Sequence, residues 1–198
     1  EASSIGIEEH RLDGTHIHTA VFTNFTQDHL DYHGSMQAYW LAKAKLFAWP
    51  GLKAAVINVD DIHGQALAQQ LTAAQQLDMW TVAVDQPARL RAQNVRHGVR
   101  GLSFEVCEAD KVFTMETGLI GQYNVSNMLG VLATLRTLNI DLADAVQICA
   151  DLDPVPGRME QIAEPNQPLV VVDYAHTPDA LEQAIQGLQP VAKARGGR

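Results

Sequence analysis

The sequence predicts an α/β fold in which short apolar strands alternate with amphipathic helices. A β-branched, alternating segment at 15–25 leads through a helix to a buried strand at 53–59, and a second helix at 62–76 leads to a third strand at 79–84. Strands that alternate with helices in this way are typical of parallel sheets with helices on their faces.

The first of these helices begins after Ser35, which is in the position of an N-cap, and its apolar residues recur at helical spacing from Met36 to Phe47. Farther along, the segments 102–107 and 112–117 flank the acidic turn Glu108-Ala109-Asp110 and indicate an antiparallel hairpin. Two helices follow the hairpin. Each has one apolar face, formed by Met128, Leu129, Leu132 and Leu135 in the first and by Leu142, Ala145, Val146 and Cys149 in the second.

Two prolines and a glycine at 153–157 interrupt every periodic pattern and indicate a domain boundary. We therefore expect one domain at 1–156 and the start of another at 157–198. In the second, an apolar strand at 169–172 precedes Thr177-Pro178, which predicts an N-cap and a proline in the first helical position. The helix that follows has an apolar face at Leu181, Ala184, Ile185 and Leu188.

The composition is globular, with 46% hydrophobic and 19% charged residues, and the net charge of −9 excludes non-specific binding to nucleic acid or to an anionic membrane. No apolar run approaches the roughly 20 residues that span a bilayer. Cys107 and Cys149 match no metal-ligand spacing, which favours reduced thiols in a cytosolic protein. The chain starts without Met and stops directly after a helical pattern, so we interpret it as an internal fragment, and it contains no Gly-Lys pair and hence no P-loop.

Lys43 has the most informative position of any single residue. Advancing roughly 100° per residue from Met36 places Lys43 at roughly 340°, between Tyr39 at roughly 300° and Phe47 at roughly 20°, on the apolar face. Such a lysine either lays its stem on the core with the ammonium at the edge, or it has a function. Lys45, at roughly 180°, should be solvated.

Three other segments combine polar groups with positions that suit a site. The loop Asp28-His29-Leu30-Asp31-Tyr32-His33 follows a strand and is either a metal or phosphate site or a polar turn with capping aspartates. Asn124 is in the position of an N-cap, whereas Asn127, in the first turn of the helix, could instead bind a base edge. Asp173 and His176 follow a parallel-type strand, where α/β sheets bind ligands, although they could equally serve only as caps. Arg158 is either a surface charge or a phosphate contact.

Together these segments resemble the Mur ligases, ATP-dependent enzymes that form amide bonds in peptidoglycan synthesis. The resemblance runs in family order along nearly the whole chain. It is carried by Glu1-Ala2-Ser3-Ser4, Thr23-Asn24, Asp28 to Gly34, Ala42-Lys43, Gly121 to Asn127, Gly157-Arg158-Met159-Glu160 and Asp173 to Asp179. The strings DHLDYHG and DYAHTPD favour the branch that adds the third amino acid, meso-diaminopimelate or L-lysine, to a UDP-N-acetylmuramoyl dipeptide.

The resemblance implies a role for each of these positions. Glu1, His29 and a carbamylated Lys43 would hold Mg²⁺, with His29 and Lys43 as catalytic residues. Ser3, Glu9 and Arg11 would line the nucleotide-sugar site, although the family pattern has Gln where this chain has Glu9, and an acid there would repel a phosphorylated substrate. ATP would be contacted by Asn124, Asn127, Arg158, Asp173 and His176.

The implied fold is most of a central ATPase-type domain with a mixed sheet, followed by the first β-α step of a Rossmann-like domain. The implied reaction activates a carboxylate as an acyl phosphate, which the incoming amine attacks. Without the P-loop and most of the C-terminal domain, we expect no catalysis by these 198 residues alone. The alternative is a P-loop-less module that binds a nucleotide sugar or serves as a scaffold. In either case we expect a monomer.

Overall fold

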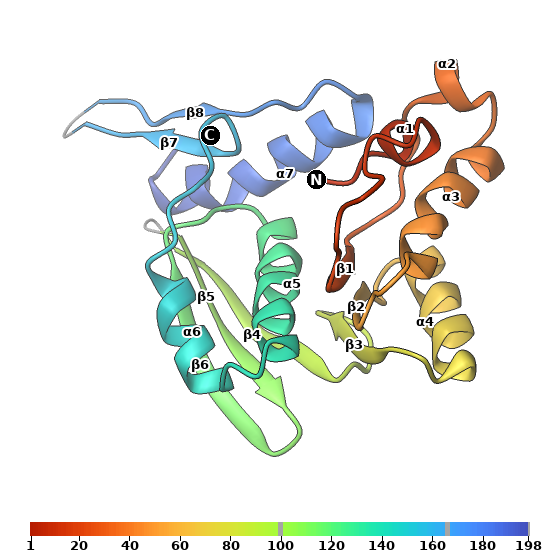
Figure 1. Cartoon of the computed structure of the whole chain (residues 1–198). Coiled ribbons are helices and arrows are strands. Elements are labelled where there is room, and N and C mark those ends of the chain that lie inside the picture. Colours follow the sequence, from red (N-terminus) through yellow and green to blue (C-terminus); the bar gives the residue numbers. More distant parts are fainter. Residues whose placement is uncertain (99–100, 165–166, 198) are drawn as a thin grey trace. The chain divides into compact units, whose positions relative to one another are not determined.

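The computed structural model describes residues 1–98, 101–164 and 167–197 (Figure 1). The chain forms two compact units, Glu1–Arg89 and Leu90–Arg198, and each is described by itself below. Arg198, the last residue of the predicted second domain, lies outside the described residues. The predicted domain boundary at residue 156 falls inside the second unit and stays a prediction.

The first unit contains the predicted parallel strands. β1 (Thr19–Phe22), β2 (Ala54–Asn58) and β3 (Asp78–Ala83) pair in that order, with Thr19 opposite Ala54 and Ala54 opposite Asp78. β1 is shorter than the predicted segment 15–25. The strand does not extend to residue 25, because the N–H of Phe25 donates to the Asp61 carboxylate, 2.8 Å away, instead of to a neighbouring strand.

Four helices complete this unit: α1 (Ser4–Glu8), the single turn α2 (Leu30–His33), α3 (Met36–Ala44) and α4 (Ile62–Ala74). α3 continues as a 3-10 turn, Lys45–Ala48. The predicted cap at Ser35 is confirmed, since its hydroxyl accepts from the N–H of Ala38 at 3.2 Å. Asp61 caps α4 by accepting from the N–H groups of His63 and Gly64.

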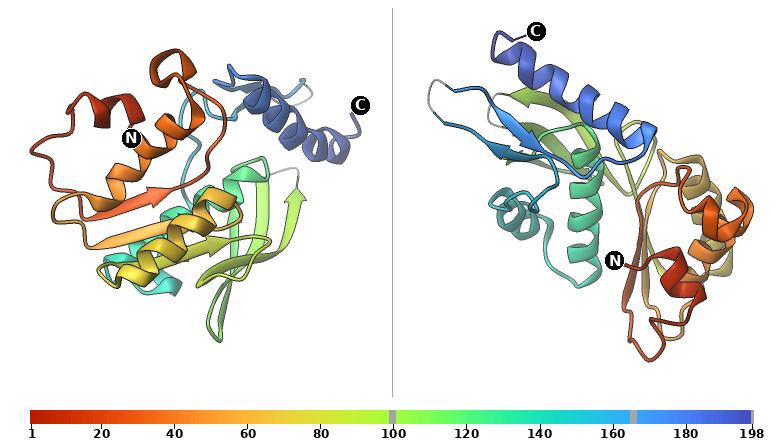
Figure 2. Two further views of the ribbon diagram at one scale, coloured as in Figure 1. Left: turned by 90° about the vertical axis from the view of Figure 1, so that its right-hand side faces the viewer. Right: turned by 90° about the horizontal axis from the view of Figure 1, so that it is seen from above.

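In Figures 1 and 2, α3 and α4 cover one face of β1, β2 and β3. The core of the first unit lies between these strands and the two helices. Successive strand residues point to opposite faces, so every second residue of β1 and β2 faces these helices. The buried cluster joins Ala20, Phe22, Ala55 and Ile57 from the strands to Tyr39, Phe47, Leu67 and Ala68.

The second unit starts with three antiparallel strands: β4 (Leu90–Gly98), β5 (Gly101–Glu108) and β6 (Lys111–Thr117). The predicted hairpin is confirmed as β5 and β6. β4 is not among the predicted elements, because only Leu90 and Ala92 of its residues are fully buried and its register shifts between Gln93 and Arg96. A largely polar strand with a bulge has no clear alternation of buried and exposed residues.

α5 (Tyr123–Thr137) and α6 (Leu142–Ala150) contact β4 and β6 respectively and also contact each other. The predicted apolar face of α6 is confirmed, since its four residues are all buried, and three of the four predicted residues of α5 are buried while Leu135 is partly buried.

The last elements are β7 (Glu160–Ile162), β8 (Val170–Val172) and α7 (Pro178–Ala194). Thr177 caps α7 as predicted, accepting from the N–H of Ala180 at 3.2 Å. The expectation of a parallel-type strand is wrong for the described residues, because β8 pairs antiparallel with β7.

The predicted face of α7 is also partly wrong. Leu181 and Ile185 are exposed, whereas Ala184 is buried and Leu188 is partly buried, as predicted. Gly187 and Val191, which the prediction left out, are also buried. A β-carbon on Gly187 would lie only 3.0 Å from the Cα of Gly121, so this helix approaches its neighbour on its small residues. None of the helices in the described parts of the chain is both long enough and apolar enough to cross a bilayer.

Gly64 allows the close approach of α4 to β2, and a substitution at this position tests that packing. A β-carbon at Gly64 would lie 1.9 Å from the carbonyl oxygen of Asn58. Gly64→Ala should therefore lower the free energy of unfolding by about 1–3 kcal/mol in urea, although alanine normally stabilises a helix relative to glycine. Gly118→Ala is the control, because nothing lies within 4 Å of its β-carbon. An unchanged or more stable Gly64→Ala chain would contradict the packing described.

Candidate functional site

The carboxyl ends of β1 and β2 hold the loop that carries the predicted metal-site histidine. The side-chain amide of Asn58, at the end of β2, donates to the carbonyl oxygen of Thr23 at 2.8 Å. Together with the bond from Phe25 to Asp61, this contact ties the loop after β1 to the end of β2 and the start of α4. These two hydrogen bonds therefore fix the start of the loop that leads into α2.

His29 stands at the start of α2 in a left-handed backbone conformation, with φ 51°. Its N–H donates to Oδ1 of Asp28 at 2.8 Å, and its Nε2 lies 3.6 Å from Oδ2 of the same residue. The imidazole meets the ring of Tyr39 edge-on, with the ring centres 5.8 Å apart. A carboxylate on one side and an aromatic ring on the other thus orient this imidazole.

Lys43 lies on the inward face of α3, as the helical spacing predicts. It is half-buried, and its Nζ lies 5.0 Å from the centre of the Tyr39 ring. Loss of solvent lowers the pKa of the Lys43 ammonium, whereas the nearby carboxylates of Glu1 and Asp28 act in the opposite direction. Lys45 is exposed, as predicted, and pairs with Glu8 at 2.7 Å.

The predicted ligands of the metal site therefore gather around Tyr39. His29 and Lys43 both contact its ring, and the charge of Glu1 acts on both Lys43 and Tyr39. A carboxylate, an imidazole and a lysine that can be modified to a carboxylate form a donor set that suits a divalent cation. No group of three His, Cys, Asp or Glu side chains among the described residues could hold a metal, so the site fits a metal only through Lys43.

The predicted nucleotide-sugar residues flank α1, with Ser3 directly before it and Glu9 and Arg11 after it. The hydroxyl of Ser3 caps α1 by accepting from the N–H of Gly6 at 3.0 Å. The carboxylate of Glu9 pairs with the guanidinium of Arg11, and both side chains are exposed. This ion pair gives Glu9 a partner that the sequence pattern did not indicate. An exposed pair contributes about 1 kcal/mol or less, so Arg11 can exchange it for another anion.

The predicted adenine residues lie in the first turn of α5, in the second unit. The capping role considered for Asn124 is wrong: Gln122 is the residue before the helix, and the Asn124 amide donates to the carbonyl oxygen of Ile120 at 2.7 Å. Asn127 donates to the side-chain oxygen of Asn124 at 3.1 Å. The backbone of Gly121, with φ 90°, turns the chain into this helix.

The three remaining predicted nucleotide residues lie close together at the end of β8. Asp173 accepts from the N–H groups of Met159 at 2.9 Å and Ala175 at 2.8 Å. The Cζ of Arg158 lies 5.1 Å from the centre of the Tyr174 ring, which also meets the imidazole of His176 at 5.2 Å. Tyr174 therefore lies between Arg158 and His176 and contacts both. It is not among the predicted site residues, although the DYAHTPD segment contains it.

Tyr123, at the start of α5, connects this cluster to the two asparagines. Burial raises the pKa of the Tyr123 hydroxyl to about 12, the charge of Asp173 adds to the increase, and Arg158 opposes it. All five predicted nucleotide residues thus lie on neighbouring segments of the second unit. The predicted metal and sugar residues lie in the first unit.

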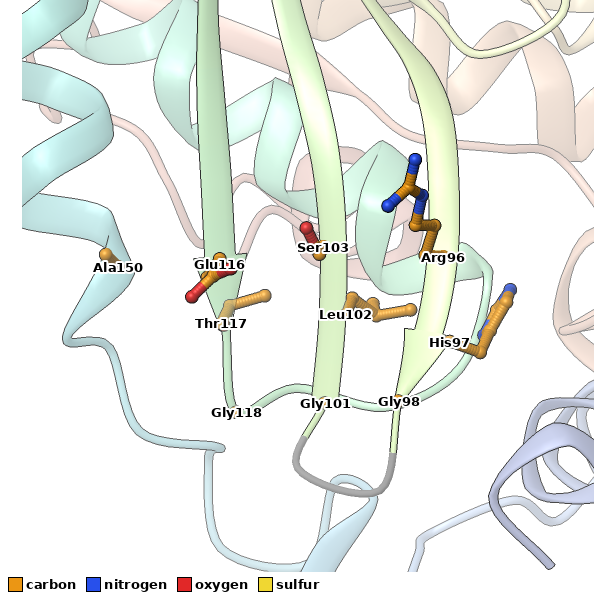
Figure 3. Close-up of a pocket in the computed structure, with 10 residues that line it drawn as sticks. All are labelled: Arg96, His97, Gly98, Gly101, Leu102, Ser103, Glu116, Thr117, Gly118 and Ala150. Carbon is orange, nitrogen blue, oxygen red and sulfur yellow. The ribbon is translucent and has the colours of Figure 1, made fainter. Parts of the chain in front are cut away.

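Two hollows of the surface, one in each unit, are lined by residues other than the predicted site residues. One of about 500 Å³, in the second unit, is lined by residues from β4, β5 and β6, with Ala150 at its side (Figure 3). Another of about 760 Å³, in the first unit, lies beside Trp49 and the segment 13–16.

Comparison with known proteins supports the resemblance in both the N-terminal and the C-terminal part of the chain. Residues 1–135 match the profile described as the Mur ligase middle domain, and residues 157–197 match the one described as Mur ligase, glutamate ligase domain. A UDP-N-acetylmuramoyl-L-alanyl-D-glutamate–2,6-diaminopimelate ligase of Acidovorax sp. (strain JS42) is 60% identical over all 198 residues, and one of Janthinobacterium sp. (strain Marseille) is 48% identical over 203 aligned positions. The chain covers 39% and 40% of the lengths of these two relatives.

Solved structures agree with this comparison. A structure of a UDP-N-acetylmuramoyl-L-alanyl-D-glutamate–2,6-diaminopimelate ligase superposes with a TM-score of 0.82 at 38% identity, over 96% of this chain and 39% of that one. A pseudomurein peptide ligase type C of Methanothermus fervidus has the same fold, with a TM-score of 0.75 at 18% identity, over 91% of this chain and 43% of that one.

The raised pKa of Tyr123 gives a prediction for high pH. A group that binds its proton more tightly when folded contributes stability below its unfolded pKa and loses it as the pH rises through the folded value. The free energy of unfolding should therefore fall between pH 10 and pH 12 in the native chain and fall less in Tyr123→Phe. Absorbance titration should show that the substitution removes a tyrosinate component near pH 12. If that component persists in Tyr123→Phe, the assignment to Tyr123 is wrong.

Proposed function

Since the chain belongs to the Mur ligase family, we propose that it forms part of an ATP-dependent ligase that joins meso-diaminopimelate to UDP-N-acetylmuramoyl-L-alanyl-D-glutamate. The names of the relatives that are 41–60% identical support diaminopimelate as the added amino acid over lysine. The observation in the structure that carries the proposal is the half-buried Lys43, which shares the Tyr39 ring with His29 and is acted on by the charge of Glu1.

The reaction needs its carboxylate activated, because a carboxylate is a poor acyl donor. ATP transfers its γ-phosphoryl group to the substrate carboxylate, which yields an acyl phosphate and ADP. The amine of the incoming amino acid then attacks the acyl carbon, loses a proton and expels phosphate to leave an amide. The protein's part is mainly to position the reactants and neutralise their charges.

Glu1, His29 and carbamylated Lys43 would hold Mg²⁺ in this proposal. When bound, the ion supplies positive charge beside the transferring phosphoryl group. A carbamate forms when the neutral amine nitrogen of a lysine attacks CO₂ and releases a proton. Desolvation of Lys43 lowers its pKa and so increases the fraction of neutral amine at a given pH. Asp28 orients the ring of His29 by its contact on Nε2 and by its bond to the backbone.

Ser3 and Arg11 would bind the nucleotide-sugar substrate, and Glu9 would hold Arg11 in its absence. A guanidinium can form paired hydrogen bonds with a carboxylate or a phosphate, which suits a substrate that has both. This assignment gives Glu9 a role without placing its charge against the substrate.

The second unit would bind ATP. Asn124 and Asn127 would meet the adenine edge, and Arg158, Asp173 and His176 would contact the nucleotide. Asp173 also holds the start of β7 to the turn after β8 through two backbone N–H groups, so it fixes the place of Arg158 as well.

Two further parts of the proposal concern organisation and location. The family matches end at residue 135 and begin again at 157, which supports a domain boundary in the segment 153–157. Cys107 and Cys149 are both buried thiols, which supports the reducing environment of the cytoplasm.

The two lysines of α3 and its extension provide the test of this proposal. In a complete ligase that contains this chain, Lys43→Ala should abolish ligation, and added short carboxylic acids should partly restore it by replacing the carbamate. Lys45→Ala is the matched control. It should change kcat/KM by less than about fivefold, because the exposed pair with Glu8 contributes about 1 kcal/mol or less. Full activity in Lys43→Ala, or equal losses in both variants, would overturn the assignment.

A further inference from the structure

His33, the last residue of the Asp28–His33 loop, makes three kinds of contact in the structure and has no role so far. Its backbone N–H donates to the carbonyl oxygen of His29 at 3.0 Å, so the two histidines are one helical turn apart. Its ring stacks on Tyr39, with the centres 5.3 Å apart and the planes at 23°. Its Nε2 lies 2.9 Å from Oγ of Ser4, within hydrogen-bond distance.

Ser4 makes this last contact informative. It is 1% exposed and one of the few fully buried polar side chains in the part of the chain that the structure describes. A buried hydroxyl is costly unless it has a partner, and His33, 29 residues away, supplies one. Ser4 is also the first residue of α1 and directly follows Ser3.

The contacts of His33 therefore connect two groups of proposed site residues. On one side lies α1 with Ser3, and on the other lies the Tyr39 ring with His29 and Lys43. Tyr39 is only 5% exposed and also packs against Phe25, with the ring centres 4.8 Å apart, so it forms a rigid base for the stack.

We propose that His33 is a positioning residue of the ligase. Its hydrogen bond to Ser4 and its stack on Tyr39 hold α1, and with it the proposed nucleotide-sugar residue Ser3, at a set distance from His29 and Lys43. This inference rests on the proposed function and adds to it how the acceptor substrate is aligned with the phosphoryl-transfer residues. His33 touches no reactant and acts through Ser4 and Tyr39.

A second tie between α1 and the end of α3 provides a control. Glu8 of α1 pairs with Lys45 at 2.7 Å, but this pair is exposed to water. If alignment depends on the buried contact, Glu8→Gln should leave the kinetics almost unchanged. If any loosening of α1 is sufficient, Glu8→Gln should behave like a change at His33.

The experiment measures KM for the nucleotide sugar, KM for ATP and kcat in a complete ligase that contains this chain. His33→Phe keeps a stacking ring and loses the hydrogen bond, Ser4→Ala removes the other partner, and His33→Gln keeps a nitrogen that can reach Ser4. We expect about a tenfold rise in KM for the nucleotide sugar in His33→Phe and in Ser4→Ala, and no further rise in the double variant. KM for ATP should not change, and His33→Gln should regain most of the affinity for the nucleotide sugar.

The outcomes separate this inference from the function on which it rests. A complete ligase without ligation activity would overturn the proposed function. An active ligase in which both single variants are silent, or raise both KM values together, or add in the double variant, would overturn the role of His33. Thermal unfolding of each variant identifies any that fail to fold. If His33→Phe fails to fold, the KM values of Ser4→Ala and His33→Gln, which keep the Tyr39 ring, decide whether His33 has this role.

Discussion

The buried ring of Tyr39 is the contact on which the candidate site of the first unit depends. Phe25 packs against it, His29 meets its edge, His33 stacks on it, and the ammonium of Lys43 lies 5.0 Å from its centre. These residues come from the loop after β1, from α2 and from α3. An aromatic ring is suited to this because its face attracts a cation and its edges and faces pack against other rings.

The same ring places Lys43 between two opposing effects. Packing against it removes water from the ammonium and lowers the pKa, while Glu1 and Asp28 favour the charged form. Desolvation is the larger effect, so the net shift is downward. A lysine that reacts with CO₂ must first be neutral, and the carbamate that it becomes needs a cation beside it. The balance found in the structure suits the first requirement, and the carboxylate and imidazole ligands proposed for the metal suit the second.

Features that depend on local spacing could be predicted from the sequence. The helical period of about 3.6 residues predicts that Lys43 faces inward and that Lys45 is exposed. The hydroxyl of Ser35, directly before the helix, predicts the cap. Features that depend on contacts between distant segments could not. The bond between Ser4 and His33 joins residues that have no shared pattern, and β8 pairs with β7 through Val170 and its neighbours rather than with a parallel strand.

The most direct test of this account is the pKa of Lys43 in the 198-residue chain. The chain has five lysines, so NMR titration of ¹³C-labelled lysine side chains should resolve them, and Lys43→Arg identifies the signal of Lys43. The Lys43 signal should titrate with a pKa below the ordinary value of 10.5, and Tyr39→Leu, which removes the ring and admits water, should move this pKa back toward that value. A Lys43 signal that titrates at or above 10.5 in the native chain would contradict the account.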